Sequence, residues 1–95
     1  MIKIIKYNEN WLELELTEDD HTIGNLLRGI LMMDEHVKQA GYRVIHPITG
    51  GIRIVIHMDG KESPKDALIN ALLKIEKDAQ ELREKISHIL KERRT

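Results

Sequence analysis

The chain has 95 residues, of which 41% are hydrophobic and 33% charged, and its formal net charge at pH 7 is -1. This length allows one domain, and the balanced charge argues against a protein that grips nucleic-acid phosphates unaided. The absence of cysteine excludes disulfides, zinc–thiolate sites and thiol catalysis, and it fits a reducing cytoplasm. No apolar run reaches membrane-spanning length. We therefore expect residues 1–95 to form one cytoplasmic domain with no membrane span and no leader.

The first two elements are predicted to form a β-hairpin. Residues Ile2 to Tyr7 favour a strand, and Asn8 to Asn10 supply a turn. From Leu12 to Thr17 leucines alternate with polar residues, which is typical of a strand with one buried face. In an antiparallel register, Lys3 and Lys6 would lie opposite the two glutamates of that second strand.

An amphipathic helix is predicted next. Apolar residues recur at spacings of three and four from Ile23 to Leu31, and we expect the helix to end near His36. Asp20 or Thr22 is the expected N-cap, and the acidic residues beside it suit the positive end of the helix dipole. Gly41 is expected to break the pattern.

A second hairpin and a long helix complete the chain. Strands are predicted at Tyr42 to His46 and at Ile52 to Met58, joined by a proline- and glycine-containing loop. Ser63 and Pro64 then provide an N-cap and a first-turn proline for a helix that reaches roughly Glu92. The order β-β-α-β-β-α predicts an α+β domain with an antiparallel four-stranded sheet and both helices on one face.

The last helix carries an apolar stripe, here called the seam. Its residues alternate between spacings of four and three, the rhythm that lets one helix pack lengthwise on another. The seam consists of Leu68, Leu72, Ile75, Ala79, Leu82, Ile86 and Ile89, with Leu90 beside its far end. Such a stripe is either the core side of an amphipathic helix or a surface for a partner.

Helix length separates these two interpretations. Twenty-nine residues at about 1.5 Å each make roughly 43 Å, whereas a compact domain of this size is about 30 Å across. The sheet can cover the start, where Ile69, Ala71 and Leu73 widen the apolar face, and we expect the intramolecular core to end near Ala79. The portion from Leu82 to Leu90 is therefore predicted to bind a partner, with a frayed end as the alternative.

The sequence shows no arrangement typical of catalysis. The five histidines fall in separate elements without a His-x-x-x-His pair, and no nucleophile stands in a recognisable motif. We therefore expect no catalytic residue, no cofactor and no metal. The basic end from Lys91 to Arg94 suits the negative pole of the helix dipole, with nucleic-acid contact as the less favoured interpretation.

The segment from Asp20 to Arg28 is harder to explain by helix periodicity alone. Gly24 costs a helix about 1 kcal/mol relative to alanine, so we expect another group to approach the backbone closely there. Asn25 and Arg28 are three residues apart and share a helix face. They form either an ordinary polar side of the helix or a docking surface for another protein.

This segment, D-H-T-I-G-N-L-L-R, closely resembles the D-H-T-L-G-N-L-L-R signature of the archaeal RNA polymerase subunit L family and its eukaryotic counterparts. It is also similar to the G-H-T-L-G-N-A-L-R-R stretch of the bacterial alpha subunit. The resemblance extends to Tyr42, His46-Pro47, Asp59-Gly60 and the opening of the long helix. Ile45 stands where a proline is common, and Gly29 where the bacterial stretch has its second arginine.

The resemblance implies a non-catalytic subunit of DNA-dependent RNA polymerase. Such a subunit forms a heterodimer with the D-type subunit of the polymerase, in the manner of the bacterial alpha dimer, and the pair is a platform for the large catalytic subunits. The seam would face the D-type subunit. His21 and Thr22 would fix the start of the signature helix, and Asn25 and Arg28 would contact a large subunit or brace the signature.

A free-standing nucleic-acid-binding module is the alternative from a different class. Phosphate binding releases counterions, so steeply salt-dependent binding of DNA or RNA by the purified chain would favour this alternative.

Overall fold

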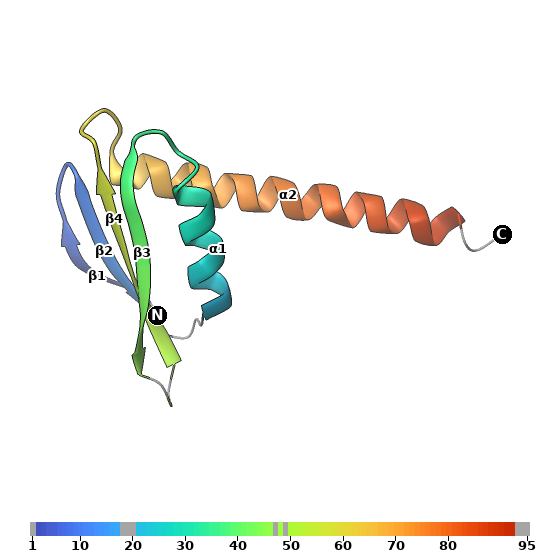
Figure 1. The fold of residues 1–95 in the computed structure, drawn as a ribbon. Coiled ribbons are helices and arrows are strands. Elements are labelled where there is room, and N and C mark those ends of the chain that lie inside the picture. Colours follow the sequence, from blue (N-terminus) through green and yellow to red (C-terminus); the bar gives the residue numbers. More distant parts are fainter. Residues whose placement is uncertain (1, 18–20, 47, 49, 93–95) are drawn as a thin grey trace.

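The computed structural model describes residues 2–17, 21–46, 48 and 50–92 (Figure 1). Two strands precede the first helix and two follow it, and a long helix comes last. The elements are β1 (Ile2–Tyr7), β2 (Trp11–Leu16), α1 (His21–Leu31), β3 (Val37–His46), β4 (Gly50–Met58) and α2 (Pro64–Glu92). The predicted order and the α+β class are confirmed. The predicted cap at Asp20 lies outside the described residues.

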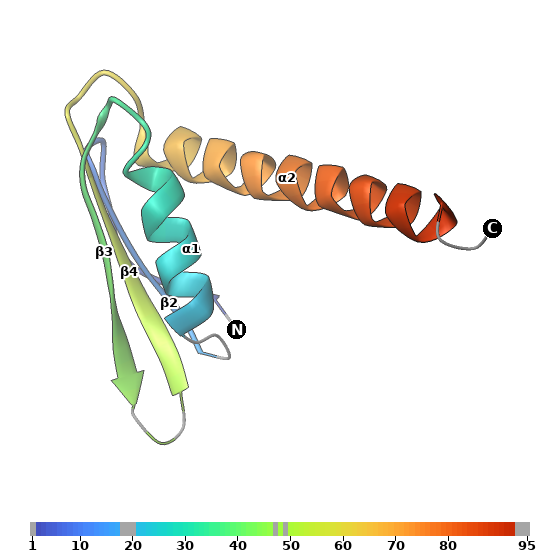
Figure 2. The same ribbon diagram turned by 45° about the vertical axis from the view of Figure 1, so that its right-hand side comes forward.

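The four strands form one antiparallel sheet in the order β1-β2-β4-β3. Lys3 lies opposite Glu15 and Lys6 opposite Glu13, as the hairpin pattern predicts. Both helices cover the same face of the sheet (Figures 1 and 2). Helix α1 packs mainly on β3, and the start of α2 packs on β2 and β4. Strand β1 lies at one edge of the sheet, by the strand order, and it is exposed along its whole length.

The core lies between this face and the two helices. Its central residues on β4 alternate as predicted, with Ile52 and Ile56 completely buried. The buried hydrophobic residues that α2 contributes are small, Ala67 and Ala71, so the helix axis can lie close to the sheet and to α1, while Leu68 and Ile75 pack half-buried against the core. The buried apolar residues are Leu12, Leu14, Leu27, Leu31, Val37, Ala40, Ile52, Ile54, Ile56, Met58, Ala67 and Ala71.

Two boundaries around α1 differ from the prediction. The helix ends at Leu31 rather than near His36, and the chain turns through residues 32–36, where the Asp34 carboxylate accepts the His36 amide hydrogen at 2.9 Å. Strand β3 then begins at Val37 and runs through Gly41. A register shift after Val37 places Val37 and Ala40 both in the core, three residues apart. Because these two buried residues are not two apart, the first part of β3 lacks the alternation that marks a strand.

Helix α2 has the predicted bounds, and the Ser63 hydroxyl accepts the Asp66 amide hydrogen at 3.1 Å as its N-cap. The helix then projects away from the sheet (Figure 2), and the molecule measures 55 Å along its longest axis. Its last contact with the core is the half-buried Ile75, one turn before the expected boundary at Ala79. Among the described helices, none is long and apolar enough to cross a membrane.

The expectation that the sheet covers Ile69 and Leu73 is wrong, because these side chains are 43% and 57% exposed. Both lie on a side of α2 turned away from Ala67 and Ala71, the buried core residues of the helix. Helix α2 therefore meets its own domain through a narrow strip.

A polar junction joins the α1–β3 and β4–α2 connections. His36 Nδ1 lies 3.0 Å from Asp59 Oδ2, and this hydrogen bond raises the pKa of His36. A hydrogen bond between Glu62 and Asp34, together with burial, raises the pKa of Glu62 to about 7, while the pKa of Asp34 is lowered. The junction fixes where α2 starts, since Glu62 stands two residues before it.

The junction predicts that stability declines as pH rises. The pKa values of Glu62 and His36 are raised in the folded chain, so these groups bind protons more tightly there than in the unfolded chain. Ionisation of Glu62 as pH rises through about 7, and loss of the His36 proton as pH rises, therefore lower the free energy of unfolding. The lowered pKa values of Asp34 and Asp59 act only in acid, below their ordinary 3.8. Urea unfolding should therefore give a smaller free energy at pH 8 than at pH 5.

The variant Glu62→Gln supplies the control for this prediction. Its amide still donates a hydrogen bond to Asp34 but does not titrate, so the decline between pH 5 and pH 7 should become shallower. Identical pH profiles for the wild type and Glu62→Gln would contradict the assignment.

Candidate protein interaction surfaces

The seam on the projecting part of α2 is fully open to solvent. Leu82, Ile86, Ile89 and Leu90 are between 48% and 60% exposed, and every residue from 76 to 92 is exposed. The stripe continues the line of Ile75, which packs at the edge of the core. One helix face therefore begins as core and ends as an uncovered apolar surface.

A second uncovered apolar surface lies on β1. Ile2, Ile4 and Tyr7 pair with the three leucines of β2, so their side chains point to the helix-covered side of the sheet. They are nevertheless 69%, 62% and 53% exposed, because neither helix reaches the β1 edge. The residue pattern predicts the strand but does not reveal this exposure. The sequence does carry a signal for it: four strands are predicted, but only two helices are available to cover them, and one of these is too long to lie wholly on the sheet.

Helix α1 adds a third apolar strip beside the projecting part of α2. Ile30 lies next to Ala67 and Ala71 of α2. Ile23 and Leu26 fall on the same side of α1 as Ile30 by their spacing, and they are 36% and 44% exposed. Figure 2 shows α1 and the projecting helix diverging from the place where they meet. Beside α1, α2 presents Asn70 and Lys74 as well as Ala67 and Ala71.

The predicted signature residues divide into an inward and an outward group. Gly24 is buried, and a Cβ built on it would lie 2.5 Å from Cδ2 of the Tyr42 ring. The expected close approach to the helix backbone is therefore present, and the approaching group is a side chain of β3. Thr22, Asn25 and Arg28 are exposed on α1. The side chain of His21 lies outside the described part of the structure.

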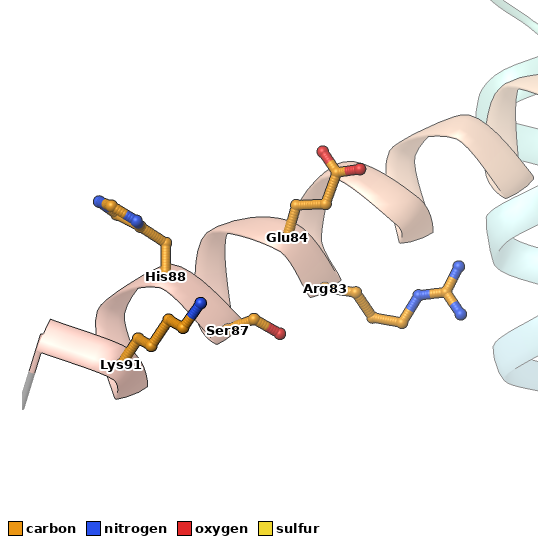
Figure 3. A pocket seen from close by; sticks show the side chains of 5 residues that line it. All are labelled: Arg83, Glu84, Ser87, His88 and Lys91. Carbon is orange, nitrogen blue, oxygen red and sulfur yellow. The ribbon is translucent and has the colours of Figure 1, made fainter. Parts of the chain in front are cut away.

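Side chains that could ligate a metal ion are not clustered among the described residues. These residues contain no group of three or more histidines and carboxylates placed to hold a metal ion. A depression on α2 is lined by five polar side chains of that one helix and is walled by no other element (Figure 3). These side chains are Arg83, Glu84, Ser87, His88 and Lys91. The features that stand out are therefore apolar surfaces, which suit protein contacts.

Comparisons with known proteins agree with this. Residues 12–85 match the family described as the RNA polymerase Rpb3/Rpb11 dimerisation domain. The chain is 41% identical over 90 residues to DNA-directed RNA polymerase subunit Rpo11 of Sulfurisphaera tokodaii, covering 95% of this chain and 97% of that one. The Rpo11 subunit of Sulfolobus acidocaldarius is 46% identical over 71 residues, covering 75% and 79% of the two chains.

A solved structure shows the same fold. The crystal structure of DNA-directed RNA polymerase subunit L from Thermoplasma acidophilum superposes with a TM-score of 0.80 at 22% sequence identity. The superposition covers 92% of this chain and 85% of that one.

The contact between Gly24 and Tyr42 yields a test of the signature helix. Gly24→Ala should lower the free energy of unfolding by about 1–3 kcal/mol, because overpacking against the ring outweighs a helix-propensity gain of about 1 kcal/mol. Urea unfolding measures the difference.

Gly29→Ala is the matched control on the same helix. A Cβ at Gly29 meets nothing within 4 Å, so this variant should gain about 0.5–1 kcal/mol. If both variants gain stability equally, the Tyr42 contact is not the reason for Gly24.

Proposed function

The chain belongs to the family of the RNA polymerase Rpb3/Rpb11 dimerisation domain, and we propose that it acts by pairing with the D-type subunit of the polymerase. In this proposal the heterodimer is a platform on which the large catalytic subunits assemble, and RNA synthesis is carried out by those other chains. The chain then contributes surfaces rather than reactive groups.

The single observation that carries the proposal is the uncovered seam. Leu72, Ile75, Ala79, Leu82, Ile86, Ile89 and Leu90 form the proposed interface. Leu72 is 49% exposed although it stands beside the buried Ala71, because it lies on the side of α2 away from α1. A partner helix laid along the seam would remove these side chains from water, at about 25 cal/mol for each Å² of apolar surface.

The other apolar strips support the same partner site. Ile23 and Leu26 of α1 are exposed on a helix that covers the same face of the sheet as α2. Ile2 and Ile4 of β1 offer further apolar surface on the same side of the sheet. One partner with a long amphipathic helix would thus cover surfaces from three elements that the chain itself leaves open.

The signature helix is proposed to serve a different contact. Thr22, Asn25 and Arg28 are exposed, whereas Gly24 and Leu27 hold α1 against the sheet. Arg28 can form forked hydrogen bonds to a carboxylate or to main-chain oxygens of a large subunit, and Asn25 can donate and accept beside it. His21 and Thr22 are proposed to fix the start of this helix.

The seam is tested by placing charge on it. The double variant Leu82→Asp and Ile86→Asp should abolish co-elution with the co-expressed D-type subunit in size-exclusion chromatography, because two carboxylates would have to be buried in an apolar contact. The fold should survive, since both positions are exposed and lie beyond the core.

The matched control places the same two charges on the polar side of the helix, as Ser87→Asp and His88→Asp (Figure 3). This variant should co-elute one-to-one with the D-type subunit, like the wild type. Far-UV circular dichroism checks that both variants keep their helix. Undiminished co-elution of the variant with Leu82→Asp and Ile86→Asp would contradict the proposal.

A further inference from the structure

The face of the sheet that carries no helix has a hollow of about 270 Å³ between β2, β3 and β4. On this outer side, Gly41 of β3 pairs with Val55 of β4 and contributes no side chain, so the hollow opens above Val55. The hollow is lined by Trp11, Gln39, Gly41, Tyr42, Arg43, Arg53, Val55 and His57. None of the surfaces assigned so far includes it.

Nothing in the chain's own fold requires glycine at position 41. The positive backbone φ angles among the described residues belong to Gly50, Gly51 and Gly60, and a Cβ added at Gly41 would meet nothing within 4 Å. Glycine inside a strand lowers its stability, since it loses more conformational entropy on folding than other residues. A group that approaches from outside, and needs the empty space, would explain it.

The charges beside the hollow are unbalanced. Arg43 and Arg53 lie directly opposite each other on β3 and β4, an arrangement of like charges that weakens a sheet. Arg53 is paired with Glu15, which accepts hydrogen bonds from its Nε at 3.2 Å and from its Nη2. For Arg43 no ion pair is found among the described residues, and its side chain is exposed. The Glu15 carboxylate therefore pairs with Arg53, and the guanidinium group of Arg43 is left without an ion pair among the described residues.

The opposite rim of the hollow is aromatic and fixed. The rings of Trp11 and His57 lie 5.2 Å apart between centroids, and Trp11 Nε1 donates to Glu13 Oε1 at 2.8 Å. Lys6 Nζ stands 5.1 Å from the Trp11 ring centroid. The hollow thus combines an apolar floor, an aromatic wall and a cationic wall, each on a rigid strand.

We propose that this hollow docks an acidic protein segment, with a carboxylate of the segment on Arg43 and an adjoining apolar part of it above Gly41 and Val55. The proposal rests on the proposed function only in placing the segment on a polymerase subunit other than the D-type subunit. A protein segment fits better than nucleic acid, because the floor is apolar and the chain as a whole carries a net charge of -1.

The test uses the heterodimer of this chain with the D-type subunit, titrated with the assembly of the remaining recombinant polymerase subunits. Arg43→Glu reverses the charge, and Gly41→Ala places in the hollow a methyl group whose Cβ meets nothing within 4 Å in the free chain. Each should weaken binding of the assembly roughly tenfold or more. The first loses a charge-assisted hydrogen bond, and the second occupies space that the acidic segment needs. Raising the salt concentration should weaken wild-type binding and affect Arg43→Glu less.

Lys38→Glu is the matched control, with the same charge reversal on an exposed residue of β3 that does not line the hollow. It should bind the assembly within about twofold of the wild type, because the change in binding free energy is smaller than the contribution of one hydrogen bond. All three variants should pair with the D-type subunit normally. If the wild type does not pair with the D-type subunit, the proposed function is contradicted. If pairing is normal and only the binding of the assembly fails to respond to the variants, the proposal for the hollow is contradicted.

Three results would overturn the hollow itself. One is wild-type binding of the assembly by both Arg43→Glu and Gly41→Ala. Another is loss of pairing with the D-type subunit in either variant, which would make the hollow part of the pairing surface. The third is binding of a DNA duplex or single-stranded RNA probe by the wild-type heterodimer that Arg43→Glu removes, which would assign the hollow to a phosphate ligand.

Discussion

Helix α2 is longer than the sheet to which its first turns are anchored, and this mismatch governs the rest of the molecule. The helix meets its own core through Ala67, Leu68, Ala71 and Ile75, and every later described residue is exposed. A helical segment of this length is marginal in water by itself, since nucleation is costly and packing supplies most helical stability. Ion pairs such as Lys74 with Asp78 and His88 with Glu92 add only a few tenths of a kcal/mol each.

The remaining elements set the direction in which this helix leaves. The junction of His36 with Asp59 and of Glu62 with Asp34 fixes the start of α2 relative to the sheet. The Tyr42 ring packs against the backbone of Gly24, so α1 lies close to β3. In this position α1 contacts α2 on one side only. The other side, above β1, stays open. The domain thus leaves the seam of α2 and the apolar side chains of β1 open to a partner helix.

Local patterns predicted the elements well, and contacts between distant residues account for what was missed. Ser63 and Pro64 correctly marked the start of α2, because capping depends on neighbouring residues alone. The bulge after Val37 escaped notice, since its pairing with β4 is set by tertiary contacts. Gly24 predicted a close approach, but only the structure identifies Tyr42 as the neighbour. The seam followed from spacing, whereas its last core contact depends on where α2 leaves the sheet.

The most direct test is amide hydrogen exchange along α2, measured in the free chain and in its heterodimer with the D-type subunit. We predict that amides from 79 to 92 exchange quickly in the free chain, because no other element covers them, and become strongly protected in the heterodimer. Amides near Ala67 and Ala71 should be protected in both states, since they belong to the chain's own core. Equal protection of the projecting part in both states would contradict the claim that it is the pairing surface.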